Sequence, residues 1–179
     1  MNFCSKCGHP VQLGIPPDDD RERHICQSCG MVHYQNPKLI VGCIIHWEDN
    51  ILLCKRAIEP RYGLWTTPAG FLENGESLEE GAVRETWEEA RAEVEISRIF
   101  AISSLPHINQ IYVHFLAKLK HLNFSPGPES EDVQLFHKDE IDWDSIAFSA
   151  VSFALTSYVH DPDSLQVYCN TIIKRQWTE

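Results

Sequence analysis

The sequence of 179 residues contains no long apolar run and no leader pattern at its N-terminus. Its longest apolar stretch, residues 39–47, is too short to span a bilayer, which takes about 20 residues of helix. The first residues, MNFCSKCG, lack the basic segment followed by an apolar segment that marks a secretory signal peptide. We therefore expect no membrane-spanning helix and a cytoplasmic protein.

Positive charge is also scarce, because 15 Lys and Arg stand against 26 Asp and Glu, a net charge of -11. This balance argues against a broad basic surface and so against a nucleic-acid partner. An acidic protein that handles phosphate groups needs metal ions or a few local arginines to do so. At the same time, 43% of the residues are hydrophobic, enough to bury the core of a domain.

The seven cysteines are an odd number, which does not fit a complete disulfide framework. Four of them form two C-x-x-C pairs, Cys4 with Cys7 and Cys26 with Cys29, and a glycine follows each pair. The spacing between the pairs lies in the range for tetrahedral zinc. Because four thiolates leave no open coordination position, we expect a structural zinc ribbon over residues 1–35.

The remaining residues, 36–179, are expected to form a second domain. Residues 77–91 predict a helix, opened by a capping box of Ser77 and Glu80, and residues 145–159 predict a second amphipathic helix. Loops are expected at 60–68 and 125–132, and strands at 39–47, 51–55, 94–103, 111–119, 133–136 and 165–173. This order predicts an α/β or α+β sandwich around a mixed sheet.

The helix expected at 77–91 concentrates like charge on one face. Glu85, Glu88 and Glu89 are spaced i, i+3 and i+4, and unpaired they would repel one another. A hard divalent cation such as Mg²⁺ or Mn²⁺ resolves the repulsion, since it prefers oxygen ligands, and Arg84 can orient a carboxylate. The alternative is a solvated acidic face. The adjoining face is expected to pack on the core through Ala82, Val83, Thr86 and Ala90.

The segment around this helix matches the pattern G-x5-E-x7-R-E-U-x-E-E-x-G-U, in which U is aliphatic. The matching positions are Gly70, Glu76, Arg84, Glu85, Glu88 and Glu89. On these residues the chain resembles the Nudix hydrolases. The resemblance implies an α/β/α sandwich around a mixed sheet, and hydrolysis of a nucleoside diphosphate linked to another group. Thr86 stands where an aliphatic residue is usual, and Arg91 stands where a glycine is usual. Because that glycine often ends the helix in a left-handed conformation, the sequence does not predict how the helix ends at Arg91.

The resemblance also implies a catalytic site. Glu85, Glu88 and Glu89 would hold Mg²⁺ or Mn²⁺, with the Gly70 carbonyl as a further ligand. The general base is either a signature glutamate or a carboxylate of the loop 128–132, where Glu129 and Glu131 are candidates. The alternative for that loop is a solvated acidic surface.

Substrate contacts are expected from side chains outside the signature. Arg56 is a candidate phosphate ligand, or else part of a surface ion pair. Candidates to stack on adenine or flavin are Trp65, Phe71 and Tyr112, unless these rings belong to the core.

Flanking segments resemble, within this family, the plant-type FAD and ADP-ribose pyrophosphatases. They include Y-Q-N-P-K at 34–38, G-L-W-T-x-P-A-G at 63–70 and P-G-P-E-S at 126–130. FAD, cleaved to FMN and AMP, or ADP-ribose is therefore the expected substrate. NADH pyrophosphatases share the ribbon, but their S-Q-P-W-P-F-P-x-S motif is absent from 104–110, so NADH is the alternative.

Other classes of function remain open. One is a nucleotide-sensing Nudix module without catalysis, and another is a protein that acts on capped RNA. The relatives imply a homodimer.

Overall fold

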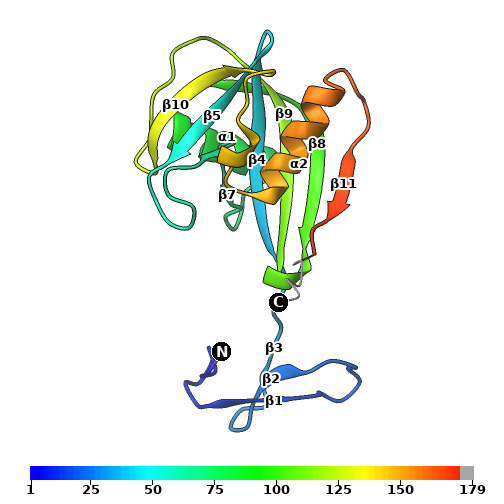
Figure 1. Cartoon of the computed structure of the whole chain (residues 1–179). Helices are drawn as coiled ribbons and strands as arrows, with labels where there is room; N and C mark the ends of the chain where they lie inside the picture. Colours follow the sequence, from blue (N-terminus) through cyan, green and yellow to red (C-terminus); the bar gives the residue numbers. More distant parts are fainter. Residues whose placement is uncertain (174–179) are drawn as a thin grey trace, which may run out of the picture. The chain divides into compact units, whose positions relative to one another are not determined.

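The computed structural model describes residues 1–173, so the last six residues of the domain expected at 36–179 lie outside the described part. The chain divides into two compact units, Met1–Asn36 and a second unit that begins at Pro37 (Figure 1). Across the described residues, every helix is too short or too polar to cross a bilayer.

The first unit is a small antiparallel sheet in the order β1-β2-β3. Its strands are β1 (Val11–Gly14), β2 (Arg23–Cys26) and β3 (Val32–His33). Gly8 and Gly30 follow the two cysteine pairs with a φ of 72° each, and each amide donates to the carbonyl of the first cysteine of its pair. Glycine allows this left-handed turn without steric cost, so each pair sits on the same kind of knuckle.

The second unit is built on a mixed sheet in the order β10-β5-β4-β9-β8-β11. These strands are β4 (Lys38–Trp47), β5 (Asn50–Arg56), β8 (Val94–Leu105), β9 (Gln110–Leu119), β10 (Ser130–His137) and β11 (Tyr168–Thr171). Two short strands pair beside them, β6 (Trp65–Thr66) with β5 and β7 (Ala69–Phe71) with β4. The pairs β4–β9 and β8–β11 are parallel and the others antiparallel.

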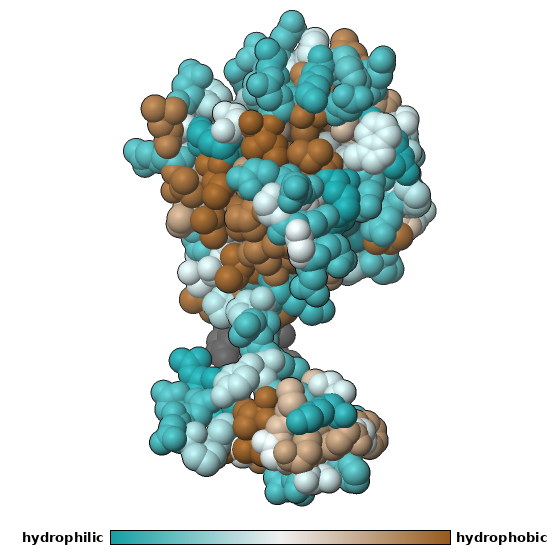
Figure 2. Space-filling view, turned by 180° about the vertical axis from the view of Figure 1, so that it is seen from behind, coloured by the Kyte–Doolittle hydropathy of each residue, from teal (hydrophilic) through white to brown (hydrophobic). Residues whose placement is uncertain are grey.

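Two helices cover opposite faces of this sheet (Figure 1). The helix α1 (Leu78–Ala90) packs with Val41, Cys43 and Val113 in one apolar cluster, and α2 (Ser149–His160) packs with Ile44 and Leu116 in another. The α1 side is only partly covered, because α1 lies mainly on β4 and β7. Figure 2 shows a broad group of apolar side chains on the face turned away in Figure 1.

The expected fold class, an α/β/α sandwich around a mixed sheet, is confirmed. β10 begins at Ser130, inside the loop expected at 125–132, and β11 spans only Tyr168–Thr171 of the strand expected at 165–173. Three further details of the prediction were wrong. First, α2 begins at Ser149 rather than at 145, because Trp143–Ser145 forms a separate 3-10 turn whose N-cap is Asp142. Second, β6 lies inside the loop expected at 60–68. Third, Val83 is 42% exposed, whereas its neighbours Ala82 and Ala90 are fully buried.

Candidate active site

The four cysteines of the first unit converge as the sequence predicts. Their sulfur atoms all lie within 4.8 Å of one another, with Sγ–Sγ distances of 3.7 Å for Cys4–Cys29 and 3.5 Å for both Cys7–Cys26 and Cys7–Cys29. A regular zinc tetrahedron with Zn–S bonds of about 2.3 Å has sulfurs about 3.8 Å apart. The donor set therefore fits structural zinc.

The helix α1 starts and ends at residues that the sequence marks. Ser77 and Glu80 form the expected capping box, in which each side chain accepts from the other residue's amide. Thr86 is buried, and its hydroxyl donates to the Ala82 carbonyl at 2.8 Å. Arg91 closes the helix with φ 48° and ψ 29°, the left-handed conformation that glycine usually supplies, and its guanidinium lies 5.6 Å from the centroid of the Trp87 ring.

Arg84 holds the carboxylates of the signature together. It donates to Glu76 at 2.6 and 3.0 Å, to Glu85 at 2.7 Å and to Glu88 at 3.0 Å. A fifth hydrogen bond runs to the carbonyl of Phe71, the residue after Gly70. These carboxylates, Glu76 first, hold the pKa of Arg84 above its ordinary value. One arginine thus fixes α1 against the strand β7 and orients two of the three glutamates.

Glu89 is the most buried carboxylate of the group, with 6% exposure. Its Oε2 accepts from the Ala69 amide at 3.1 Å, yet burial raises the pKa of Glu89 to about 8. Burial likewise raises the pKa of Glu85. A buried anion is costly without a counter-charge, and the positive charge of Arg56 only partly offsets this for Glu89. The two buried carboxylates, Glu85 and Glu89, therefore fit a site that binds a cation.

Gly70 leaves the space that Glu85 occupies. A Cβ at position 70 would lie 2.3 Å from Glu85 Oε2, closer than two unbonded atoms can come. Only glycine allows the carboxylate this close to β7. The close approach of the Glu85 carboxylate to Gly70 fits the proposed set of metal ligands. That the Gly70 carbonyl is itself a ligand stays a prediction.

The glutamates are less tightly gathered than the cysteines. Within residues 1–173, the cysteines alone form a group of three or more potential ligand atoms all within 4.8 Å of one another. The Glu88 side chain is 53% exposed and can turn toward a cation without repacking.

Beside the glutamates lies a pocket of about 970 Å³. Its lining includes four glutamates, Glu85, Glu88, Glu89 and Glu129, together with Arg56, Phe71, Tyr112 and Phe148. The loop before β10 brings Glu129 here, because the Gly127 amide donates to the Glu89 carbonyl at 2.9 Å. That contact is so close that a Cβ on Gly127 would lie 1.7 Å from the Glu88 carbonyl oxygen. The structure thus brings together Arg56, Gly70, Phe71, Arg84, Glu85, Glu88, Glu89, Tyr112 and Glu129.

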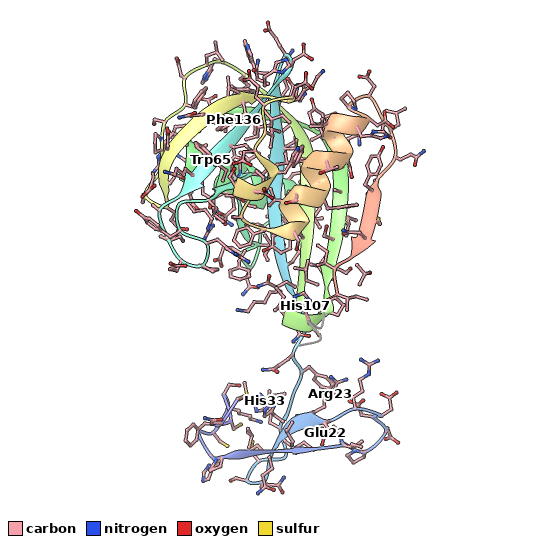
Figure 3. All side chains as sticks on the ribbon, in the orientation of Figure 1. Glu22, Arg23, His33, Trp65, His107 and Phe136 are labelled. Carbon is pink, nitrogen blue, oxygen red and sulfur yellow. The ribbon has the colours of Figure 1, made fainter. Side chains whose placement is uncertain are left out.

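Two predicted site residues lie outside this lining. Trp65 packs edge-to-face on Phe136, with ring centroids 4.7 Å apart, and so belongs to the core under α2 (Figure 3). Glu131 accepts from the Tyr62 hydroxyl and pairs with Lys55 at 3.3 Å. Of the two candidate late carboxylates, Glu129 lines the pocket, whereas Glu131 and Trp65 do not.

Sequence reasoning missed the contribution of α2. Phe148, Ser149 and Val151 line the pocket from the start of this helix. A helix expected to begin at 145 places Phe148 inside its first turn. The absence of a capping side chain at Phe148 was the signal that could have shown an open helix end.

An α/β/α sandwich with a carboxylate-rich helix beside a pocket fits a hydrolase that uses a divalent cation. Residues 36–154 match the family described as NUDIX domain, and residues 2–35 match the zinc ribbon described as Nudix N-terminal. The chain therefore belongs to the Nudix hydrolase family, with an N-terminal zinc ribbon.

Solved structures support this assignment. The crystal structure of a NUDIX hydrolase from Nitrosomonas europaea is 51% identical, with a TM-score of 0.94, and the match covers 97% of this chain and 100% of that one. The crystal structure of an ADP-ribose pyrophosphatase from Streptococcus suis is 25% identical, with a TM-score of 0.62, over 76% of this chain and 100% of that one.

Curated relatives correct the narrower resemblance. An NAD-capped RNA hydrolase of Stutzerimonas stutzeri is 31% identical over 144 residues, which cover 78% of this chain and 49% of the relative. Its counterpart from Photobacterium profundum is 32% identical over 131 residues, 72% of this chain and 47% of the relative. The chain spans about half the length of these relatives, which are not plant-type FAD or ADP-ribose pyrophosphatases. The ribbon and the Y-Q-N-P-K linker also occur in NADH pyrophosphatases, so they could not separate the groups.

Proposed function

We propose that this chain is a divalent-metal-dependent diphosphatase of dinucleotide-type substrates, with an NAD-type dinucleotide placed first and FAD or ADP-ribose second. The observation that carries the proposal is a group of glutamates lining a pocket that is also lined by aromatic side chains and by Arg56. The names of the curated relatives support the NAD-type substrate. The name of the Streptococcus suis structure supports ADP-ribose.

Glu85, Glu88 and Glu89 would hold Mg²⁺ or Mn²⁺, because hard cations take oxygen ligands. When bound, such a cation neutralises charge on the diphosphate and activates water. The chain's own part is to orient these carboxylates through Arg84 and to leave room for them at Gly70. Zinc would stay in the ribbon, where four cysteines leave no position for a substrate.

In the proposed reaction, water adds to one phosphorus and the bridging P–O bond breaks, which yields two phosphate monoesters. The water loses a proton, and we assign its acceptance to Glu129. This carboxylate lies on the pocket wall, and its charge acts on both Glu85 and Glu89. A positioned carboxylate is a suitable general base.

The turn between β8 and β9 bears on the choice of substrate. Leu105, His107, Ile108 and Gln110 line the pocket, and they belong to the segment that lacks the NADH-type motif. This observation favours keeping FAD and ADP-ribose as second candidates. The homodimer and the cytoplasmic location stay predictions.

The test is an incubation of the zinc-loaded protein with Mg²⁺ or Mn²⁺ and equal amounts of NADH, NAD-capped RNA, FAD and ADP-ribose. Chromatography of the products should show two monophosphates from at least one of them, with NADH or NAD-capped RNA consumed fastest. No turnover of any substrate by the folded protein would overturn the enzyme assignment. Faster turnover of FAD or ADP-ribose would reverse the ranking.

A further inference from the structure

The loop between β5 and β6, residues 57–63, forms part of the pocket wall. Its residues 58–61 all line the pocket. Backbone hydrogen bonds close its two ends, because the Arg56 amide donates to the Leu64 carbonyl and the Arg56 carbonyl accepts from the Gly63 amide, both at 2.9 Å. The backbone therefore fixes where the loop begins and ends.

A second segment of the pocket wall is hydrogen-bonded to this loop. The Ala57 amide donates to the Glu129 carbonyl at 2.8 Å, and both Pro128 and Glu129 line the pocket. The position of Glu129, the proposed general base, is therefore tied to the position of the loop.

Glu131 lies at an irregularity in the pairing of β5 with β10. Ser130 lies opposite Arg56 and Asp132 lies opposite Lys55, so Glu131 is an extra residue on β10. An extra residue of this kind bends the strand and changes the direction of its side chains, and such bulges are common beside active sites.

The Glu131 carboxylate contacts both the loop and β5. It accepts a hydrogen bond from the Tyr62 hydroxyl and pairs with the Lys55 ammonium at 3.3 Å. These partners, Tyr62 first, hold the pKa of Glu131 below its ordinary value. Because a general base works best with a pKa near the pH of the reaction, these surroundings suit an orienting role better than a catalytic one.

We propose that Glu131 is a positioning residue, which fixes the loop 57–63 through Tyr62 and the bulge after Glu129 through Lys55. This inference rests on the proposed diphosphatase function and deepens it. The Tyr62 contact sets the shape of the pocket wall and so acts on substrate binding. The Lys55 contact sets where Glu129 stands and so acts on proton transfer from water.

The first experiment measures amide hydrogen exchange by NMR in zinc-loaded protein without substrate. The Ala57 and Gly63 amides are hydrogen-bonded in the structure, so their exchange reports opening of the loop. Y62F should raise their exchange about twofold to fivefold and E131A about threefold to tenfold, since E131A removes both contacts of the carboxylate.

Two matched controls break similar contacts elsewhere in the second unit. D49A removes the pair of Asp49 with Lys138, at the opposite end of β5 and β10. Y168F removes the hydrogen bond from the Tyr168 hydroxyl to Asp161. Both should leave exchange at Ala57 unchanged, and thermal unfolding checks that every variant is folded.

The second experiment measures kcat and KM with Mn²⁺ for NADH and for ADP-ribose. Y62F should raise KM about threefold to tenfold with kcat kept, whereas K55Q should lower kcat by a similar factor with KM kept. E131A should do both. E131Q keeps an oxygen that accepts from Tyr62, so its KM should stay within about twofold of the wild type.

The outcomes separate this inference from the proposed function. Unchanged exchange of Ala57 and Gly63 in both Y62F and E131A would overturn the positioning role whatever the activity. A loss of kcat of about a hundredfold or more in E131Q would also overturn it, because Glu131 would then be the base. If the wild type hydrolyses neither substrate, the proposed function fails, while faster exchange confined to Y62F and E131A would still support the role of Glu131 in holding the loop.

Discussion

The potential metal ligands of the zinc ribbon and those of the helix α1 are arranged differently. In the ribbon, four sulfurs lie within 4.8 Å of one another, and a zinc ion there would have no free position. Along α1, Arg84 holds two of three glutamates, Glu88 is half exposed, and a pocket opens beside them. A closed set of ligands suits a structural ion, and an open set leaves room for a substrate. We therefore expect loss of zinc to unfold the ribbon and loss of the catalytic cation to stop turnover.

The largest expected effect is on the ribbon. Removal of zinc by a chelator should unfold residues 1–36 and leave the second unit folded, because structural zinc supplies about 10–16 kcal/mol of apparent binding energy to small modules. Amide hydrogen exchange, read beside zinc content, measures this. Protection of residues 1–36 that survives zinc loss would contradict the structural role.

The next effect concerns turnover rather than folding. Glu89→Gln should lower kcat about 10²- to 10³-fold, as for loss of one preorganised charge at a reacting centre. The fold should be unchanged or more stable, since a neutral amide needs no counter-charge. Glu79→Gln, on the exposed first turn of the same helix, is the matched control. Equal kcat for Glu89→Gln and this control would remove Glu89 from the site.

Acid should act on the two units through different groups. In the ribbon it protonates thiolates and releases zinc. In the second unit, His114 is fully buried, both ring nitrogens lack a partner within the described residues, and burial lowers its pKa to about 4. The unfolded chain binds this proton near pH 6.5, so stability is lost as pH falls from about 6.5 toward 4, by up to about 3 kcal/mol.

Denaturant titrations at pH 7 and pH 5, followed by tryptophan fluorescence, measure this loss in the second unit, since every tryptophan lies beyond residue 36. His114→Gln should flatten the dependence on pH. If wild type and variant lose equal stability, His114 is not the acid-sensitive group.

The smallest effect tests how the units make left-handed turns. The ribbon uses Gly8 and Gly30, whereas α1 ends on Arg91 at φ 48°. Arg91→Gly should relieve about 1 kcal/mol of strain and lose about 0.5 kcal/mol of stacking on Trp87, a small net gain in thermal stability. A clear loss would mean that the stacking outweighs the strain.

The sequence was sufficient where ligands follow a local spacing. The cysteine pairs, the capping box at Ser77 and the glutamate face of α1 depend on residues close in the chain. The expected strands at 39–47 and 51–55 were recovered as β4 and β5 for the same reason.

Residues placed by tertiary packing could not be assigned in this way. Trp65 and Glu131 have suitable side chains, but one packs on Phe136 and the other pairs with Lys55. Phe148 lines the pocket from the position where α2 starts, which a helix expected from 145 does not indicate. Substrate choice was hardest, because the shared flanking motifs do not record the shape of the pocket.

The catalytic metal site is tested most directly by Mn²⁺ binding, followed by electron paramagnetic resonance, in zinc-loaded wild type and in a Glu85→Gln/Glu88→Gln double variant. We predict that the wild type binds Mn²⁺ and hydrolyses a dinucleotide diphosphate, and that the double variant loses both while its zinc content and fold are retained. Undiminished Mn²⁺ binding or turnover in the double variant would contradict the claim that these glutamates form the catalytic metal site.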